Sequence, residues 1–414
     1  MKIRFLVTNA YQSAGGGILR TTFTLAGELA KRHDVEIVSI LRTDHRVSYP
    51  VPAGVTLTTL VDRSPGQQYQ RVLRRLSRPS RLIHPHDPRF RHYDRVVDRA
   101  LRTYLRSLRG GVVVGTRVGL NLAIAQLVHP SVVRVGQEHM HLGRYSQQLR
   151  TAFKRHYPDL DLCSVLTEGD AKDFRNLIPA NTRLECIPNP RPDLDYVHAE
   201  NTARVVISAG RLARQKGYDQ LLEAWTHVVR KHPDWELRIF GGGPRKKDLQ
   251  QRIDRLGIGE RARLMGYTDD LTAELGAAGF YVMSSRFEGF PMVLLEAMAS
   301  HLPVVSYDCP HGPRDLLTPG QDGLLVRRRR KPRALAKAMI RMIEMDAQQR
   351  HDMGSAAVAK AQQYALPTIA RRWEDLLEEL VAERERESTD SEVSRTTRLS
   401  ATDPSDSPAA PPPT

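Results

Sequence analysis

Short apolar runs alternate along the chain with longer segments in which apolar residues recur at helical spacing. In the first half, the runs that we expect to form strands cover 3–7, 35–41, 112–115, 132–135, 163–166 and 184–187. In the second half they cover 205–208, 237–240, 263–265, 280–283, 304–306 and 323–326. Between them lie segments such as the one holding Leu19, Phe23, Ala26 and Ala30, whose apolar positions would share one face of a helix. Strands that alternate with helices in this way are typical of parallel sheets with crossover helices.

The alternation restarts near residue 203, which predicts two domains. We expect an α/β chain of two doubly wound, Rossmann-like domains, the first covering 1–195 and the second 196–365. The joint between them carries Pro188, Pro190 and Pro192, which suit a stiff connector. Residues 366–384 are expected to form a helix that returns to the first domain. From 385 to 414 the chain is rich in Ser, Thr, Asp and Pro, and this composition predicts a disordered tail.

Composition narrows the class of protein. A length of 414 residues fits two domains, and 40% hydrophobic with 26% charged residues is ordinary for a globular protein with a real core. Cys163, Cys186 and Cys309 lie far apart, which argues against a disulfide framework and a structural zinc site. No apolar stretch is long enough to span a membrane, and the apolar run at the start is too short for a signal peptide. We therefore expect a cytoplasmic protein.

Positive charge is concentrated in residues 63–109, which we interpret as a basic insertion in the first domain. This stretch holds thirteen arginines and three aspartates, which is +10 of the chain's +15. Apolar residues at helical spacing in 92–109 predict an amphipathic helix with a core-facing side and a basic outer side. The stretch 71–81 has less apolar pattern, and an anionic acceptor or an anionic membrane surface at which the protein is peripheral explains it better. Nucleic acid is disfavoured, because no reader motif is present and few aromatic residues interleave the arginines.

A glycine-rich loop, Ser13-Ala-Gly-Gly-Gly-Ile-Leu, follows the first strand and opens a helix. Glycines allow a ligand close to the backbone, and a helix N-terminus favours phosphate, so the loop is a candidate phosphate or sugar cradle. The alternative is a tight turn with no ligand. Arg20 stands where the dinucleotide fingerprint requires its third glycine, so a nicotinamide or flavin enzyme is disfavoured.

Two further stretches in the second half carry candidate chemistry. Glu288 and Glu296 flank Pro291 at a predicted helix start, where an anion and two carboxylates for hydroxyls would suit a nucleotide sugar. Arg211 and Lys216 follow the first strand of the second domain, at the edge where doubly wound sheets bind ligands, and could hold a diphosphate. Taken singly, these residues could equally be solvated surface charges, with one glutamate balancing a helix dipole.

Together these stretches resemble the family 4 retaining glycosyltransferases, also called glycosyl transferases group 1, of the GT-B fold. The resemblance runs from the glycine loop to about residue 380. Its marks, in chain order, are Gly15-Gly-Gly17, Glu138-His139, Pro188-Asn-Pro190, Gly210-Arg211, Lys216-Gly217, Phe240-Gly-Gly-Gly-Pro244, Gly266-Tyr267 and the pair Glu288 and Glu296. The resemblance implies two Rossmann-like domains that face each other across a cleft.

The resemblance also implies roles for individual residues. Arg211 and Lys216 would hold the donor diphosphate, and Glu296 would bind the ribose hydroxyls. Glu288 would contact the donor sugar near its reacting face, and His139 would reach the same sugar from the first domain. Glu288, His139, Arg211 and Lys216 would thus be the catalytic set. The remaining donor contacts would come from Gly16, Gly17, Gly266, Tyr267, Val293 and the backbone of Gly289 and Phe290.

His139 and His141 also raise the question of a metal site, because two histidines two residues apart can share one face of a strand. No third ligand lies nearby in the sequence, and the resemblance to the family 4 enzymes implies catalysis without a metal. We therefore expect neither a metal nor a cofactor. A purely structural His139 is the other alternative.

The predicted function is transfer of a sugar from a nucleotide diphosphate donor, UDP-linked by preference, with retention at the anomeric carbon. The acceptor is expected to be a glycan, a polyol phosphate or a lipid-linked or cell-wall polymer. Two alternatives stay open: a GDP- or ADP-sugar donor, and a non-catalytic basic module that binds membrane or nucleic acid.

Overall fold

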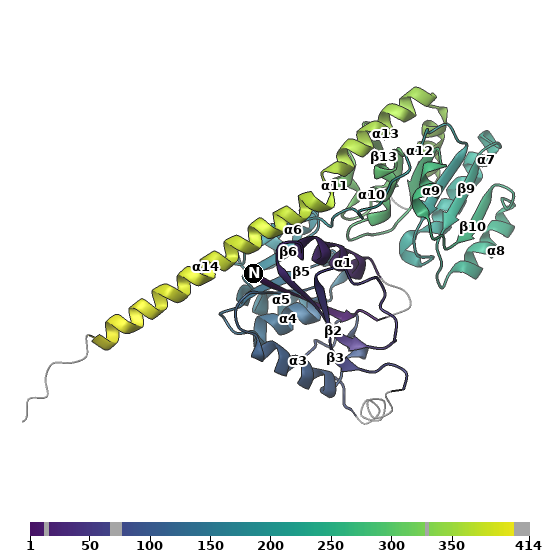
Figure 1. The fold of residues 1–414 in the computed structure, drawn as a ribbon. Helices are drawn as coiled ribbons and strands as arrows, with labels where there is room; N and C mark the ends of the chain where they lie inside the picture. Colours follow the sequence, from purple (N-terminus) through teal and green to yellow (C-terminus); the bar gives the residue numbers. More distant parts are fainter. Residues whose placement is uncertain (12–15, 67–76, 328–330, 401–414) are drawn as a thin grey trace, which may run out of the picture.

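The computed structural model describes residues 1–11, 16–66, 77–327 and 331–400. It contains two parallel α/β domains joined by the segment that follows residue 186 (Figure 1). Among the described residues, no helix is both long and apolar enough to span a membrane.

The first domain is built on a parallel sheet in the strand order β3-β2-β1-β4-β5-β6-β7. Its strands are β1 (Lys2–Asn9), β2 (Asp34–Arg42), β3 (Val55–Asp62), β4 (Val112–Gly115), β5 (Val133–Gln137), β6 (Leu162–Val165) and β7 (Leu184–Cys186). Its α-helices are α1 (Gly17–Leu29), α3 (Arg95–Ser107), α4 (Val118–Leu127), α5 (Gln147–His156) and α6 (Glu168–Arg175). Short 3-10 turns are η1 (Phe90–His92), η2 (Leu142–Arg144) and η3 (Tyr157–Asp159).

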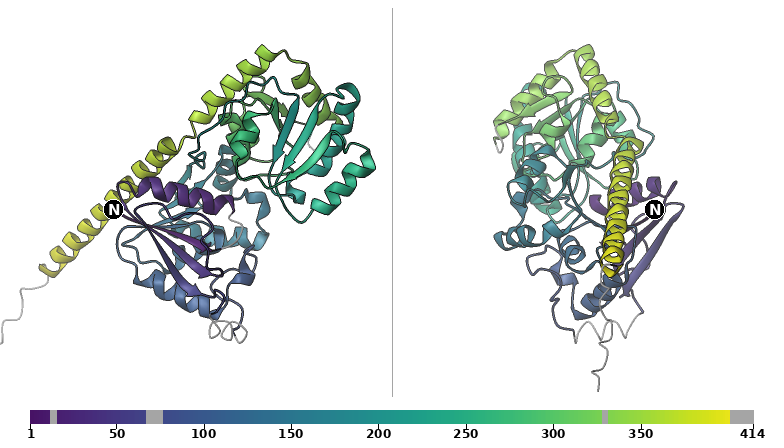
Figure 2. Two further views of the ribbon diagram at one scale, coloured as in Figure 1. Left: turned by 45° about the vertical axis from the view of Figure 1, so that its right-hand side comes forward. Right: turned by 90° about the vertical axis from the view of Figure 1, so that its left-hand side faces the viewer.

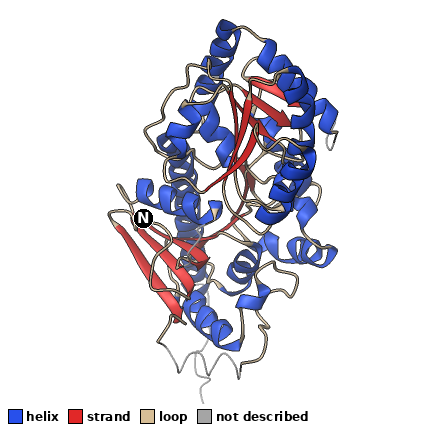
Figure 3. Cartoon of the chain, turned by 90° about the vertical axis from the view of Figure 1, so that its right-hand side faces the viewer, coloured by secondary structure: helices blue, strands red, loops and turns tan. Residues whose placement is uncertain are grey.

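The second domain repeats the plan with a parallel sheet in the order β10-β9-β8-β11-β12-β13 (Figure 3). Its strands are β8 (Val205–Ala209), β9 (Glu236–Phe240), β10 (Ala262–Gly266), β11 (Phe280–Met283), β12 (Val304–Tyr307) and β13 (Gly323–Val326). Its helices are η4 (Arg214–Lys216), α7 (Tyr218–Lys231), α8 (Lys246–Leu256), α9 (Leu271–Gly276), α10 (Met292–Ala299), α11 (Pro313–Leu316), α12 (Pro332–Glu344) and α13 (Ala347–Gln362).

The central strands are buried on both faces, which explains their continuous apolar sequence. Along β1, Ile3, Phe5 and Val7 pack into one hydrophobic cluster while Leu6 packs into another on the opposite side of the sheet. Strands covered by helices on both sides read as unbroken apolar runs. All twelve strands expected from the sequence have counterparts here, with ends that differ by at most two residues.

Strand β3 has no counterpart among the strands expected from the sequence. It lies at the edge of the first sheet, paired only with β2 in the described chain. Most of its side chains are half-buried, and its sequence is rich in threonine. An edge strand with incomplete cover needs no apolar run, so the feature that marks the other strands is missing.

Helix α14 (Leu366–Ser400) leaves the second domain and runs along the first (Figure 2). Ile369, Trp373 and Leu377 are buried in the cluster that also holds β1 and α1 residues. Glu374 accepts two hydrogen bonds from Arg32, at 2.6 and 2.8 Å. This segment therefore ties the two domains together a second time.

The helix continues well past residue 384, where the sequence pattern places its end. Ser400 is its last residue, so the helix covers the first part of the segment expected to be a tail. Charged residues four apart or three apart support such a helix in water, and Arg384 pairs with Glu387 at 3.3 Å. Residues 401–414 lie outside the described residues.

The basic insertion is organised by its three aspartates, all of them buried. Asp94 caps α3 and pairs with Arg63 at 2.7 Å. Asp98 accepts a hydrogen bond from Ser80 at 2.5 Å, and Asp87 accepts one from the backbone of Gly119 at 2.9 Å. The acids therefore hold the insertion onto the domain. The arginines of α3 lie on its outer side, as the helical spacing predicts, while residues 67–76 lie outside the described part.

Candidate functional site

The carboxyl ends of strands from both sheets carry the residues singled out in the sequence. In the first domain these are the ends of β1 and β5, and in the second the ends of β8, β10 and β11. Ligands of doubly wound sheets bind at this edge. The contacts that join the domains there include Arg20 with Glu296, and Gly289 with the backbone of His139.

Lys216 and Glu288 form an ion pair at the second-domain side of this region. The Lys216 Nζ lies 2.8 Å from Glu288 Oε1, and the Glu288 side chain is only 6% exposed. Ser285 donates a hydrogen bond to the same oxygen at 2.5 Å, and Gln215 donates one to the other oxygen at 3.3 Å. Glu288 is therefore held rigidly, with a lysine beside it that is still partly exposed.

Two glycines around this pair are required by close approach. Gly210 has φ +147°, and a Cβ there would lie 2.9 Å from the Lys216 side chain. Gly217 has φ +66°, and a Cβ there would lie 2.2 Å from the carbonyl oxygen of Ser284. Side chains other than hydrogen rarely tolerate these backbone angles. The glycines of this motif thus let Lys216 fold back over the strand end.

Glu296, the second carboxylate, faces the first domain. It lies inside α10 and its side chain is 4% exposed, and its Oε1 is 3.1 Å from Arg20 Nη1 of α1. Burial raises the pKa of Glu296 above its ordinary value, and the positive charge of Arg20 only partly offsets this. The two carboxylates are therefore distinct, one paired within its own domain and the other across the cleft.

The start of α10 explains the residues between the carboxylates. A Cβ on Gly289 would lie 2.3 Å from the carbonyl oxygen of His139, so this glycine permits the contact between the domains. The Phe290 side chain is buried in the core, with its ring 5.8 Å from that of Tyr364. Only the Phe290 backbone is thus free to face a ligand. Val293 is half-buried in the first turn of the helix.

Tyr267 stands at the end of β10 with 81% of its surface exposed, the highest value among the large hydrophobic residues given as exposed. Its ring lies over the backbone of Gly242, where a Cβ would come within 2.4 Å of the ring. The preceding Gly266 has φ +84°. An exposed aromatic face fixed by a neighbouring loop is suited to stacking against a planar ring.

Arg211 follows β8, and Gly16 and Gly17 stand at the start of α1. The Arg211 side chain is exposed and makes no hydrogen bond or ion pair with the described residues. Gly16 is the N-cap of α1, and a Cβ on Gly16 or Gly17 would meet open space. Gly15 lies outside the described residues. The helix therefore offers its N-terminus to an anion, an arrangement that the sequence motif anticipates.

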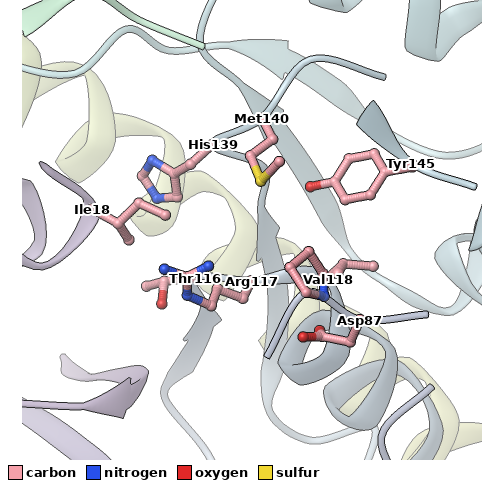
Figure 4. A pocket seen from close by; sticks show the side chains of 9 residues that line it. Ile18, Asp87, Thr116, Arg117, Val118, His139, Met140 and Tyr145 are labelled. Atoms are coloured by element: carbon pink, nitrogen blue, oxygen red, sulfur yellow. The ribbon is translucent and has the colours of Figure 1, made fainter. Parts of the chain in front are cut away.

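His139 lines a small pocket of the first domain together with Ile18, Thr116 and Arg117. Figure 4 shows the His139 ring and the Arg117 side chain on opposite sides of this pocket, beside Ile18 of α1. Both ring nitrogens of His139 are buried and have no hydrogen-bond partner. Burial and, secondarily, the charge of Arg117 lower the pKa of His139 to about 3. The imidazole is therefore neutral at physiological pH and free to bond a ligand.

His141 does not join His139 in a common site. Its ring lies 5.4 Å from that of His311 and 6.0 Å from that of Phe287, both in the second domain. In the described part of the chain, three residues whose ligand atoms could share a metal ion occur only at His33, Glu374 and Glu378. None of these three is a residue singled out for the site, and Arg32 is already bonded to Glu374. His141 thus faces the second domain, whereas His139 lines the first-domain pocket.

Glu138, the neighbour of His139 in the sequence, points into the first-domain core. It accepts hydrogen bonds from the hydroxyls of Tyr145 and Tyr157 and from Asn121, the last at 2.8 Å. Burial raises its pKa to about 7, against the opposing effect of these donors. Glu138 therefore anchors the segment after β5 that carries His139.

Sequence reasoning missed two residues that the fold brings to this region. Arg20 stood out only as a break in the dinucleotide fingerprint, although it pairs with Glu296. Arg117 gave no signal because it is one arginine among many, whereas the fold places it in the pocket with His139. Both depend on contacts between segments distant in the chain.

Known proteins share this architecture and part of this sequence. Residues 192–360 match the family model described as glycosyl transferases group 1. An exopolysaccharide phosphotransferase of Streptomyces coelicolor is 32% identical over 93% of this chain and 41% of its own length. A poly(glycerol-phosphate) alpha-glucosyltransferase of Bacillus subtilis is 27% identical over 62% of this chain and 39% of its own length. The chain thus spans well under half of these two relatives.

Solved structures resemble almost the whole chain. TarM of S. aureus, crystallised with fondaparinux, alpha-GlcNAc-glycerol and UDP, superposes with a TM-score of 0.73 at 16% identity, covering 91% of this chain and 99% of TarM. The similarity extends through both domains and the cleft between them. The chain therefore has the GT-B fold, with a second domain that matches the group 1 glycosyltransferases.

Proposed function

We propose that this chain is a retaining glycosyltransferase that transfers a sugar from a UDP-linked donor to an anionic or lipid-linked glycan or cell-wall polymer. The observation that carries the proposal is that each of two buried carboxylates is paired with a cation, one in the loop after β11 and the other in α10, facing α1. Glu288 is held by Lys216, and Glu296 meets Arg20 across the cleft.

The donor would lie along the second domain. Lys216 and Arg211 would bind its diphosphate, and the open N-terminus of α1 at Gly16 and Gly17 would face the same phosphates. Glu296 would accept hydrogen bonds from the ribose hydroxyls, and Tyr267 with Gly266 would border the base. UDP is preferred as the nucleotide because the TarM structure contains it.

Catalysis would rest on stabilising the departing diphosphate. Charge develops on its oxygens as the bond to the sugar breaks, and fixed cations and helix N-termini stabilise that charge. With the leaving group held on one face, the acceptor hydroxyl would attack from that same face, and the phosphate would take its proton. Glu288 would orient the sugar, and its backbone neighbours Gly289, Phe290 and Val293 would complete that side of the site.

His139 would act as a neutral hydrogen-bond partner of the transferred sugar. Its lowered pKa of about 3 means that it carries no charge at pH 7. A neutral imidazole can accept one hydrogen bond and donate another, which suits a sugar hydroxyl. The two unpartnered ring nitrogens support this role over a purely structural one.

The acceptor is proposed from charge and from the relatives. The Streptomyces coelicolor and Bacillus subtilis relatives are named for exopolysaccharide and poly(glycerol phosphate). The basic insertion lies in the domain opposite the donor site, where it would attract a phosphate-bearing polymer or an anionic membrane surface. We name as the loop arginines the set Arg71, Arg74, Arg75 and Arg78, of which the first three lie outside the described residues.

A panel of sugar nucleotides tests the proposal. The purified chain is incubated with UDP-, GDP- and ADP-sugars, with and without poly(glycerol phosphate) as the acceptor, and release of the nucleoside diphosphate is followed over time. We expect turnover of a UDP-sugar, with an α-linked donor giving an α-linked product by NMR. Preference for GDP or ADP would change the donor, inversion would refute retention, and no turnover or binding of any donor would refute the proposed function.

A further inference from the structure

Two arginines of the first domain lie at or next to the pocket that His139 lines, Arg117 in its wall and Arg89 directly after Pro88 of that wall, and neither is bonded to a carboxylate of the described residues. Arg117 is the N-cap of α4 and lines the pocket with His139, and Arg89 follows Asp87 in the basic insertion. Both side chains are half-buried. Neither guanidinium makes a hydrogen bond or ion pair with any residue in the described ranges.

Two other arginines of this domain that are largely buried pair with carboxylates. Arg63 lies 2.7 Å from Asp94, and Arg134 lies 3.3 Å from Asp161. Withdrawing a charge from water costs free energy unless an opposite charge compensates it. Arg89 and Arg117 have no such bonded carboxylate among the described residues, so their charge is available to an anionic ligand.

The charges around this pair are net positive. Burial, then the charge of Arg117 and more weakly that of Arg211, lower the pKa of Arg89. Arg211 thus adds a third cation from the opposite domain. Asp87 lies in the same pocket, but its two oxygens accept backbone hydrogen bonds from Arg89 at 2.6 Å and from Gly119 at 2.9 Å.

A second observation in the pocket also points to a ligand. His139 is buried there with neither ring nitrogen bonded. A guanidinium fork binds two phosphate oxygens at once, and a neutral imidazole can bond a neighbouring hydroxyl. A molecule that bears both a phosphate and hydroxyl groups would satisfy all of these atoms.

We propose that Arg89 and Arg117 form a site for a phosphate group of the acceptor, on the first-domain side of the cleft. This inference rests on the proposed function, in which Lys216 and Arg211 already serve the donor diphosphate. It narrows the acceptor to one with a phosphate close to the hydroxyl that receives the sugar. The same two arginines could instead hold the donor's own phosphates, and the experiment separates these two sources.

The test measures phosphate binding while the donor site is occupied. Inorganic phosphate and glycerol 1-phosphate are titrated by calorimetry into the chain saturated with UDP. We expect the parent to bind glycerol 1-phosphate and the variants Arg89→Gln and Arg117→Gln to bind it about tenfold or more weakly, since each removes a charge-assisted contact. Arg99→Gln, which removes an exposed arginine of α3, is the matched control and should behave like the parent.

Three results would overturn the inference. The parent saturated with UDP binds neither phosphate probe, or both Gln variants bind them like the parent, or the variants lose UDP affinity instead. A structural role is tested by thermal unfolding without ligand, where the Gln variants should be no less stable than the parent. If the parent binds no nucleoside diphosphate, the proposed function fails, and titration without nucleotide still decides whether Arg89 and Arg117 bind phosphate.

Discussion

Replacing Lys216 with Ala should separate the ion pair that its ammonium group makes in the structure from the donor contact proposed for it. Lys216 Nζ lies 2.8 Å from Glu288 Oε1, and under the proposed function it also binds the donor diphosphate. A hydrogen bond to a charged group contributes about 1.5–3 kcal/mol. At about 1.4 kcal/mol per tenfold, UDP should bind roughly 10- to 150-fold more weakly to the variant.

The variant should also lose some folding stability, because Glu288 keeps only Ser285 and Gln215 as side-chain partners. Breaking a buried ion pair costs about 3–5 kcal/mol. Lys216 is 19% exposed, so water replaces part of its effect and we expect the lower end of that range or less. The loss is measured by chemical denaturation with and without UDP.

Calorimetry with UDP on a double-mutant cycle decides between the roles. UDP carries no sugar, so Glu288→Gln alone should bind it about as well as the parent. If Lys216 contacts the phosphates, the double variant should bind as weakly as Lys216→Ala. If the double variant regains the affinity of the parent, Lys216 acts only by neutralising Glu288, and the phosphate assignment is refuted. Lys247→Ala, an exposed lysine of α8, is the control.

Three other expectations follow from the same residues. Burial outweighs Arg20 in raising the pKa of Glu296, so the folded chain holds that proton more tightly than the unfolded chain, and parent stability should fall as pH rises from about 4.5. Glu296→Gln removes this titrating group, so the melting temperature of the variant relative to that of the parent should rise between pH 5 and pH 7. UDP affinity should fall in the same variant. A melting-temperature difference that does not change with pH would contradict the burial argument. Activity should survive EDTA, and a loss that one divalent cation restores would revive a metal-dependent mechanism. Changing the loop arginines to Ser should weaken sedimentation with anionic vesicles at low salt but leave donor hydrolysis intact, and equal sedimentation of variant and parent would refute their role.

The sequence by itself determined the parallel α/β architecture, because the strands at the centre of each sheet are covered on both faces and must be apolar throughout. It also revealed Gly210 and Gly217, whose backbone angles and close contacts leave no room for a side chain. Such local requirements appear as particular residues at fixed spacing, so they can be recognised in a single sequence. Strand β3 could not be recognised from the sequence, because the side chains of this edge strand are half-exposed and need not be apolar.

Only the tertiary structure decided which charges meet. Arg20 and Glu296 are 276 positions apart, and their contact at 3.1 Å exists because the domains place α1 against α10. Arg89 and Arg117 likewise come together with His139 only in the fold, where the nearby Asp87 is already bonded to backbone N–H groups. Periodicity encodes which face of an element is buried, whereas the partner of a charged side chain depends on how distant elements pack, and no local pattern specifies that.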